Sequence, residues 1–176
     1  LGVNIPATYE GEIDRAAGPL LLVLWENLAD PILTGREQLG FSKIYCDLPE
    51  PDVDRGQTHC TASWMGFRFL DLKLDNMKAV SPEDAMSPEP PPAAGLLRGV
   101  LHYKYIPRTG EWGEADAAYA CLSPAPTGVT PPQEAWSGEG TVSFHKARWE
   151  DLPTQYMIVN ALHELEIKEY RGAKIE

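Results

Sequence analysis

The sequence has few basic residues and no long apolar run. Of its 176 residues only 15 are Lys or Arg, against 26 Asp or Glu, which gives a net charge of -11. Nucleic-acid grooves and anionic membrane surfaces are bound by basic faces, so we expect neither partner for this chain. Its longest apolar run, residues 20–25, has six residues, whereas a membrane-spanning helix needs about 20.

Cysteine is also scarce. The three cysteines are an odd number, and none has the spacing of zinc ligands. The four histidines lie far apart and form neither an HxH nor an HExxH pattern. We therefore expect no metal site and no Ser-His-Asp arrangement. Free thiols in a reducing, cytoplasmic compartment are the expected state of the cysteines. The residues concerned are Cys46, Cys60, Cys121, His59, His102, His145 and His163.

Proline and glycine divide the chain into short segments. There are 16 prolines and 15 glycines, and most segments between them are too short for helices but long enough for strands. Such a pattern is typical of a mainly antiparallel β fold. We predict a β-barrel-like sheet with one or two α-helices in a single domain, residues 1–176. The predicted strands are residues 5–13, 20–25, 44–48, 67–75, 99–106, 114–122, 141–147 and 166–175.

Several segments carry more specific expectations. Phe69-Leu70 interrupts the alternation of the strand around it, which indicates a β-bulge. Residues 79–98 contain five prolines and are expected to form a surface loop within the domain. Residues 151–165 are the clearest helix candidate, with Asp151 as the N-cap. On pattern alone, residues 114–122 fit a strand or a helix.

One segment, residues 30–45, is expected to begin as a loop after the strand at residues 20–25, and it combines flexible backbone with a reactive side chain. It contains Gly35 and Gly40, an Arg-Glu pair between them, and Lys43 among apolar neighbours. A lysine amine held against apolar surface loses the hydration of its charged form, so its pKa falls and the neutral, nucleophilic amine becomes populated. Such an amine attacks a ketone to form a Schiff base. The alternative is a structural lysine whose ammonium group extends into water.

Three segments, in the family's order, resemble the acetoacetate decarboxylase family. The first is Gly35-Arg36-Glu37 followed by Gly40-Phe41 and Lys43, which resembles the family's Gly-Arg-Glu…Pro-Lys signature. The second is Tyr103-Lys104-Tyr105-Ile106-Pro107, which resembles an apolar-Lys-apolar-Ile-Pro strand end. The third is Glu134-Ala135-Trp136-Ser137-Gly138, which resembles Glu-Ala-Trp-x-Gly. Two positions depart from the signature. Ser42 stands where the family usually has proline, and Ile44 stands where its founding enzymes have a second lysine.

The resemblance implies an antiparallel, cone-like β-barrel and cofactor-free chemistry in which the signature lysine forms the Schiff base. It makes Lys43 the expected catalytic residue. It also implies a strand at residues 114–122, homo-oligomers, and a further N-terminal portion that we expect this chain to lack. The expected structural motif is Gly35, Arg36, Glu37 and Gly40, and the expected substrate contacts are Phe41, Tyr45, Glu134 and Trp136. Glu134 fits equally well as a residue that holds a turn through side-chain hydrogen bonds.

The sequence leaves three functions open. The first is decarboxylation of a β-keto acid through an imine on Lys43. The second uses the same lysine for aldol or dehydration chemistry on another keto acid. The third is a non-catalytic barrel that binds a small ligand, with Lys43 as a structural residue. In the first two cases the expected partner is a small-molecule keto acid.

Overall fold

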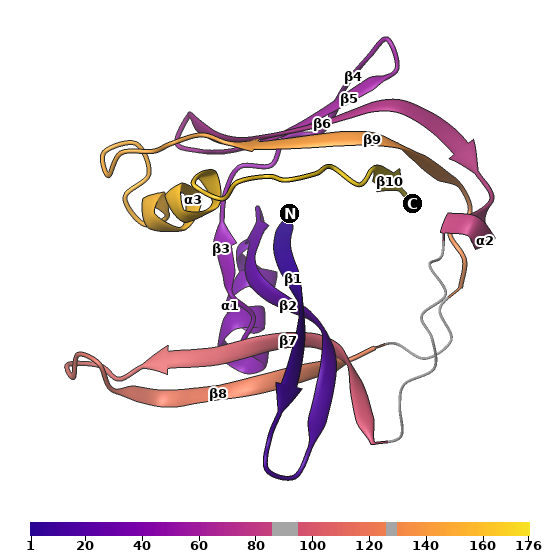
Figure 1. The fold of residues 1–176 in the computed structure, drawn as a ribbon. Helices are drawn as coiled ribbons and strands as arrows, with labels where there is room; N and C mark the ends of the chain where they lie inside the picture. Colours follow the sequence, from indigo (N-terminus) through magenta and orange to yellow (C-terminus); the bar gives the residue numbers. More distant parts are fainter. Residues whose placement is uncertain (86–94, 126–129) are drawn as a thin grey trace. The chain divides into compact units, whose positions relative to one another are not determined.

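The computed structural model describes residues 1–85, 95–125 and 130–176 (Figure 1). The described chain divides into two compact units. The first holds residues 1–45 and 95–125, and the second holds residues 46–85 and 130–176. That residues 1–176 form a single domain stays a prediction.

The first unit is a five-stranded sheet built on β2. Its strands are β1 (Gly2–Glu10), β2 (Arg15–Glu26), β3 (Lys43–Tyr45), β7 (Leu96–Pro107) and β8 (Ala115–Pro124). The order is β1-β2-β7-β8, with β3 also paired to β2. The pairs β1/β2 and β7/β8 are antiparallel, whereas β7 and β3 both run parallel to β2. Strand β7 pairs with residues 15–20 of β2, and β3 pairs with residues 24–26. The end of β2 therefore lies beside Lys43 of β3.

The apolar run at residues 20–25 lies within β2, as predicted. Val23 and Trp25 are buried, but Leu22 between them is 42% exposed. Side chains alternate between the two faces of a strand. The face that carries Val23 and Trp25 is therefore buried, and the opposite face is partly exposed at Leu22. This strand ends at Glu26, the first charged residue after the run.

A helical segment, where the sequence indicated a loop, connects β2 to β3. It consists of α1 (Ala29–Thr34) and a single π-helical stretch, η1 (Gly35–Leu39). Gly40 ends it at a φ of +82°, in the left-handed region that favours glycine, and its N–H donates to the carbonyl of Gly35. Single π-helical turns occur frequently at functional sites.

The second unit is an antiparallel sheet with the order β10-β9-β6-β5-β4. Its strands are β4 (Asp52–Asp54), β5 (Gln57–Trp64), β6 (Phe67–Val80), β9 (Ala135–Phe144) and β10 (Ala173–Ile175). A tight turn at Met65-Gly66 joins β5 to β6, with positive φ at both residues. The short helix α2 (Pro82–Ala85) follows β6, and α3 (Tyr156–His163) follows β9.

The predicted β-bulge at Phe69-Leu70 is confirmed. Ala62 pairs with Leu70 and Ser63 pairs with Arg68, so Phe69 is the extra residue on β6. The bulge turns Phe69 inward beside Leu70, and both side chains are buried.

The mainly antiparallel fold is confirmed, and residues 114–122 lie largely in a strand, β8. The strand order of neither sheet closes on itself among the described residues, so the barrel-like description is approximate. Of the expected proline-rich loop, residues 86–94 lie outside the described residues. Within the described part of the chain, every helix is too short or too polar to cross a lipid bilayer.

The C-terminal predictions were wrong in their boundaries. The helix α3 begins at Tyr156 with Gln155 at the N-cap position. The carboxylate of Asp151 instead accepts hydrogen bonds from Arg148 Nε at 2.8 Å and Arg148 Nη2 at 2.7 Å. The last predicted strand is reduced to β10, Ala173–Ile175.

Candidate functional site

Lys43 meets the end of β2 through parallel strand pairing. Leu24 pairs with Lys43, and Glu26 pairs with Tyr45. Because residues two apart on a strand share a face, the side chains of Glu26 and Lys43 emerge on the same side of the sheet. The backbone N–H of Leu24 donates to the carbonyl of Ser42 at 3.0 Å, which fixes this register.

The amine of Lys43 forms an ion pair with Glu26. Its Nζ lies 2.8 Å from Glu26 Oε1, and the two side chains are only 14% and 23% exposed. The other carboxylate oxygen of Glu26, Oε2, is buried and has no hydrogen-bond partner among the described residues. A buried polar atom without a partner is costly, so Glu26 retains an unused capacity to accept a proton or a hydrogen bond.

Gly35 provides the surface on which the lysine lies. A Cβ atom at position 35 would come within 2.5 Å of Lys43 Cδ and 2.6 Å of Cε. The helical backbone at Gly35 suits any residue, so it is the space taken by Lys43 that requires glycine here. This contact explains why the predicted structural motif has glycine at this position.

Arg36 and Phe41 hold the lysine from two further sides. Arg36 Nη1 donates a 2.7 Å hydrogen bond to the backbone carbonyl of Lys43. The Phe41 ring centroid lies 5.9 Å from Lys43 Nζ, at the outer limit of a cation–π contact. Arg36 of the predicted motif therefore fixes the backbone of Lys43, and Phe41 lies near its ammonium group.

His102 supports this arrangement from β7. It is 3% exposed and stacks on Phe41 with ring centroids 4.2 Å apart. Its Nδ1 lies 3.3 Å from the carbonyl oxygen of Gly40, and its Nε2 lies 3.1 Å from Ser123 Oγ. Burial lowers the pKa of His102 more than the hydrogen bond to Gly40 raises it. The neutral ring can then donate from Nδ1 to Gly40 and accept from Ser123.

Gly40 is required for two reasons. Besides its positive φ, a Cβ atom at this position would lie 2.5 Å from Lys104 Cβ. Lys104 itself donates from Nζ to the backbone carbonyl of Gln38 at 3.2 Å. The lysine on β7 therefore stabilises the end of the π-helical stretch.

The structure brings together part of the predicted site. Lys43, Phe41, Gly35, Arg36 and Gly40 form one cluster. Glu37 is exposed on η1, and Tyr45 is 45% exposed at the end of β3. Glu134 and Trp136 belong to the second unit, where Trp136 pairs with Ala79 of β6 and Ile175 of β10. Their contact with the substrate stays a prediction.

Sequence reasoning missed Glu26 and His102. Glu26 is the charged residue that directly follows the apolar run of β2, a position at which a carboxylate is held beside buried strand residues. His102 lies on the alternating strand at residues 99–106, but the pattern leaves open which face is inward. The sequence places Lys43 among apolar neighbours, and the structure adds the carboxylate of Glu26 against its amine.

A small cavity lies beside the cluster. Its volume is about 150 Å³, and it is lined by Arg36, Gly40, Phe41, Ser42, Tyr103 and Tyr105. Lys43 is not among these residues, since its side chain is directed across Gly35 toward Glu26. Phe41 belongs to both features: it lines the cavity, and its ring centroid lies 5.9 Å from Lys43 Nζ.

Comparisons with known proteins agree on the family. The family model for acetoacetate decarboxylase matches residues 1–174. An acetoacetate decarboxylase structure is similar over 97% of this chain and 60% of its own, with 19% identity and a TM-score of 0.68. The enzyme from Legionella pneumophila is similar over 98% of this chain and 59% of its own, with 17% identity and a TM-score of 0.68. The chain thus spans about 60% of the length of these solved relatives.

No curated protein matches the chain. At this level of identity, the solved relatives show the fold alone. The family model covers nearly every residue, including the segment with Lys43. The chain belongs to the acetoacetate decarboxylase family.

Proposed function

We propose that Lys43 is the nucleophile of a cofactor-independent lyase that decarboxylates a β-keto acid through a Schiff base. The observation that carries this proposal is the position of the Lys43 amine, 2.8 Å from Glu26 and seated on Gly35 within the family's signature segment. The substrate, the reaction and a homo-oligomeric state are proposals for this chain.

The ion pair supplies a route to the neutral amine. An ammonium group is not a nucleophile, so Lys43 must first lose a proton. Glu26 is the adjacent acceptor, and both side chains are largely removed from water. Desolvation penalises a pair of charges more than a neutral amine beside a neutral acid. Closing the site over a substrate therefore favours proton transfer from Lys43 to Glu26.

The subsequent steps follow from the chemistry of the imine. The amine attacks the ketone carbon, and the resulting carbinolamine loses water to give a protonated imine. The bond between the α-carbon and the carboxylate then breaks and carbon dioxide leaves. The electron pair of that bond forms the carbon–carbon double bond of an enamine, while the π pair of the imine moves to its nitrogen. The enamine takes a proton at carbon, and water hydrolyses the imine to release the ketone and Lys43. In this proposal Glu26, 2.8 Å from Lys43 Nζ, holds the proton and returns it during formation and loss of the carbinolamine.

One observation favours a second candidate function. A lysine paired with a carboxylate and absent from the lining of the neighbouring cavity also fits a structural role. In that case the chain is a non-catalytic member of the family that binds a small ligand. Aldol or dehydration chemistry at the same lysine differs from the proposal only in the fate of the imine.

Release of carbon dioxide from acetoacetate tests the proposal. The chain should release carbon dioxide, the Lys43→Arg variant should not, and Lys78→Gln should match the wild type because Lys78 is an exposed residue of β6. Imine formation without carbon dioxide release would favour aldol or dehydration chemistry instead. Absence of both would favour the non-catalytic function.

A further inference from the structure

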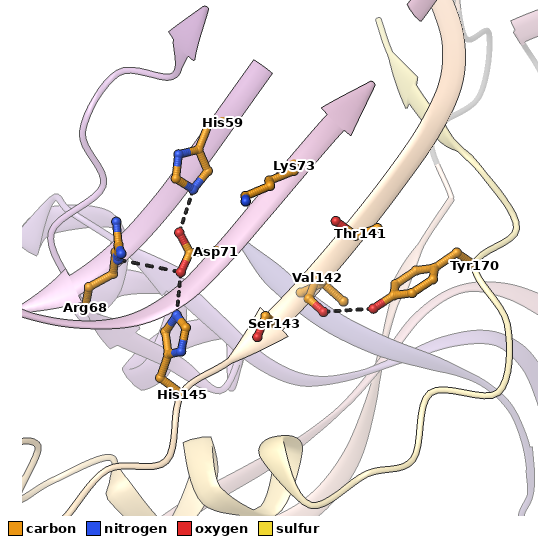
Figure 2. A pocket seen from close by; sticks show the side chains of 9 residues that line it. All are labelled: His59, Arg68, Asp71, Lys73, Thr141, Val142, Ser143, His145 and Tyr170. Atoms are coloured by element: carbon orange, nitrogen blue, oxygen red, sulfur yellow. Dashed lines mark hydrogen bonds and ion pairs between the residues drawn. The ribbon is translucent and has the colours of Figure 1, made fainter. Parts of the chain in front are cut away.

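The second unit contains a polar cavity on one face of its sheet (Figure 2). Its volume is about 460 Å³. The strand register explains how its residues come together: Asp71 of β6 pairs with Ser143 of β9, while Lys73 pairs with His59 of β5 and Thr141 of β9. The cavity lining is His59, Arg68, Asp71, Lys73, Thr141, Val142, Ser143, His145 and Tyr170.

Asp71 is fully engaged by its neighbours. His59 Nε2 lies 2.5 Å from Asp71 Oδ1, His145 Nε2 contacts Oδ2, and Arg68 Nε lies 3.5 Å from Oδ2. Burial raises the pKa of Asp71, but the hydrogen bonds from the two histidines and the charge of Arg68 outweigh it, so the pKa is lowered. Asp71 is thus an ionised carboxylate, 12% exposed, whose charge is directed at these three groups.

Lys73 has no such partner. Among the described residues its ammonium group has no ion-pair or hydrogen-bond partner, although the side chain lines the cavity (Figure 2). Arg68 approaches Asp71 through Nε, which leaves its two terminal nitrogens available in the described part of the chain. Two basic side chains therefore line the cavity, and the one carboxylate among its lining residues already contacts other groups. The chain as a whole has a net charge of -11.

We propose that this cavity binds a small oxyanion, a carboxylate or phosphate group, through Lys73 and Arg68, with the hydroxyls of Thr141 and Ser143 as further donors. A lysine and an arginine provide charge-assisted hydrogen bonds to such groups. Because His59 and His145 each contact one carboxylate oxygen of Asp71, this carboxylate does not form an ion pair with Lys73. None of these residues belongs to the segment with Lys43, so the site does not depend on the proposed lyase function.

Competing ligands fit the site less well. Within the described residues, no group of three His, Cys, Asp or Glu side chains is arranged to hold a metal ion. Asp52 and Asp54 line an adjacent cavity of about 250 Å³, together with His59 and Lys73. Their negative charges disfavour an anion there, so the oxyanion is expected on the side of Arg68 and Ser143.

Titration with inorganic phosphate at constant pH and ionic strength tests the proposal. The imidazole NMR signals of His59 and His145 should shift and saturate, while that of His163, which does not line the cavity, should not. Lys73→Gln should weaken binding about tenfold, the expected loss for one charge-assisted hydrogen bond. The control Lys78→Gln, on the same strand but outside the cavity lining, should bind like the wild type.

A parallel titration with acetate distinguishes the two kinds of oxyanion. Tighter saturable binding of phosphate assigns the site to phosphate-bearing compounds, and tighter binding of acetate assigns it to carboxylates. If Lys73→Gln does not fold, Arg68→Gln provides the same test, since Arg68 is also exposed. Shifts that never saturate for either anion, or equal affinity in the wild type and the cavity variant, would show an adventitious ion only and overturn the proposal.

Discussion

Gly35 and Lys43 are in direct contact: the lysine side chain crosses the glycine so closely that a Cβ atom at position 35 would lie 2.5 Å from Lys43 Cδ. A glycine of the π-helical stretch and a lysine at the start of β3 therefore form one structural feature. This contact directs the amine toward Glu26, and the predictions below test the consequences.

Gly35→Ala should displace Lys43 from Glu26. In a helical backbone, alanine is normally favoured over glycine by about 1 kcal/mol, but overpacking typically costs about 1–3 kcal/mol. We expect a net loss of unfolding free energy in chemical denaturation, together with loss of any reaction at Lys43. Thr34→Ala, at an exposed neighbouring position of α1, is the matched control. A stabilised Gly35→Ala variant with a fully reactive Lys43 would refute the role of this contact.

Glu26→Gln should leave the Lys43 ammonium without its carboxylate. For this largely buried pair we expect a loss of about 1–2 kcal/mol in unfolding free energy, less than for a fully buried pair because both side chains keep some contact with water. Imine formation at Lys43 should also slow, since its proton acceptor is gone. Glu37→Gln, on the exposed face of η1, controls for loss of one negative charge. Unchanged rates in Glu26→Gln would exclude Glu26 as the acceptor.

The stability of the first unit should depend on pH through His102. Burial lowers the pKa of His102 in the folded state, so near and below the ordinary histidine value of about 6.5 the unfolded state binds more protons. The contribution of His102 is therefore fully present above that pH and declines as the pH falls toward the folded pKa. Unfolding free energies of the wild type and His102→Gln, compared from pH 8 to pH 5, should differ less at the lower pH. Parallel curves would contradict this.

Much of the fold could be predicted from short-range pattern. The apolar run ending at Trp25 indicated a strand, and the broken alternation at Phe69 located the bulge. The helical segment before β3 was missed because Asp30-Pro31, Gly35 and Gly40 have the composition of a loop. In the structure, Pro31 lies in the first turn of α1, where its missing N–H has no effect.

The candidate site was only partly predictable because its contacts depend on strand register. The motif identified Lys43 and its glycines, but the contact with Glu26 arises from parallel pairing of β2 with β3 across an intervening helical segment. No local pattern encodes that register. The inward orientation of His102 likewise depends on how β7 pairs with its neighbours, which alternation alone leaves ambiguous.

Borohydride reduction in the presence of acetoacetate, followed by peptide mass spectrometry, tests the central claim most directly. Reduction converts an imine on Lys43 into a stable amine, so the account predicts added mass on the peptide containing Lys43 in the wild type and none in Lys43→Arg, with Lys104 unmodified in both. A wild-type chain that gains no mass at Lys43, or gains it equally at exposed lysines, would contradict the account.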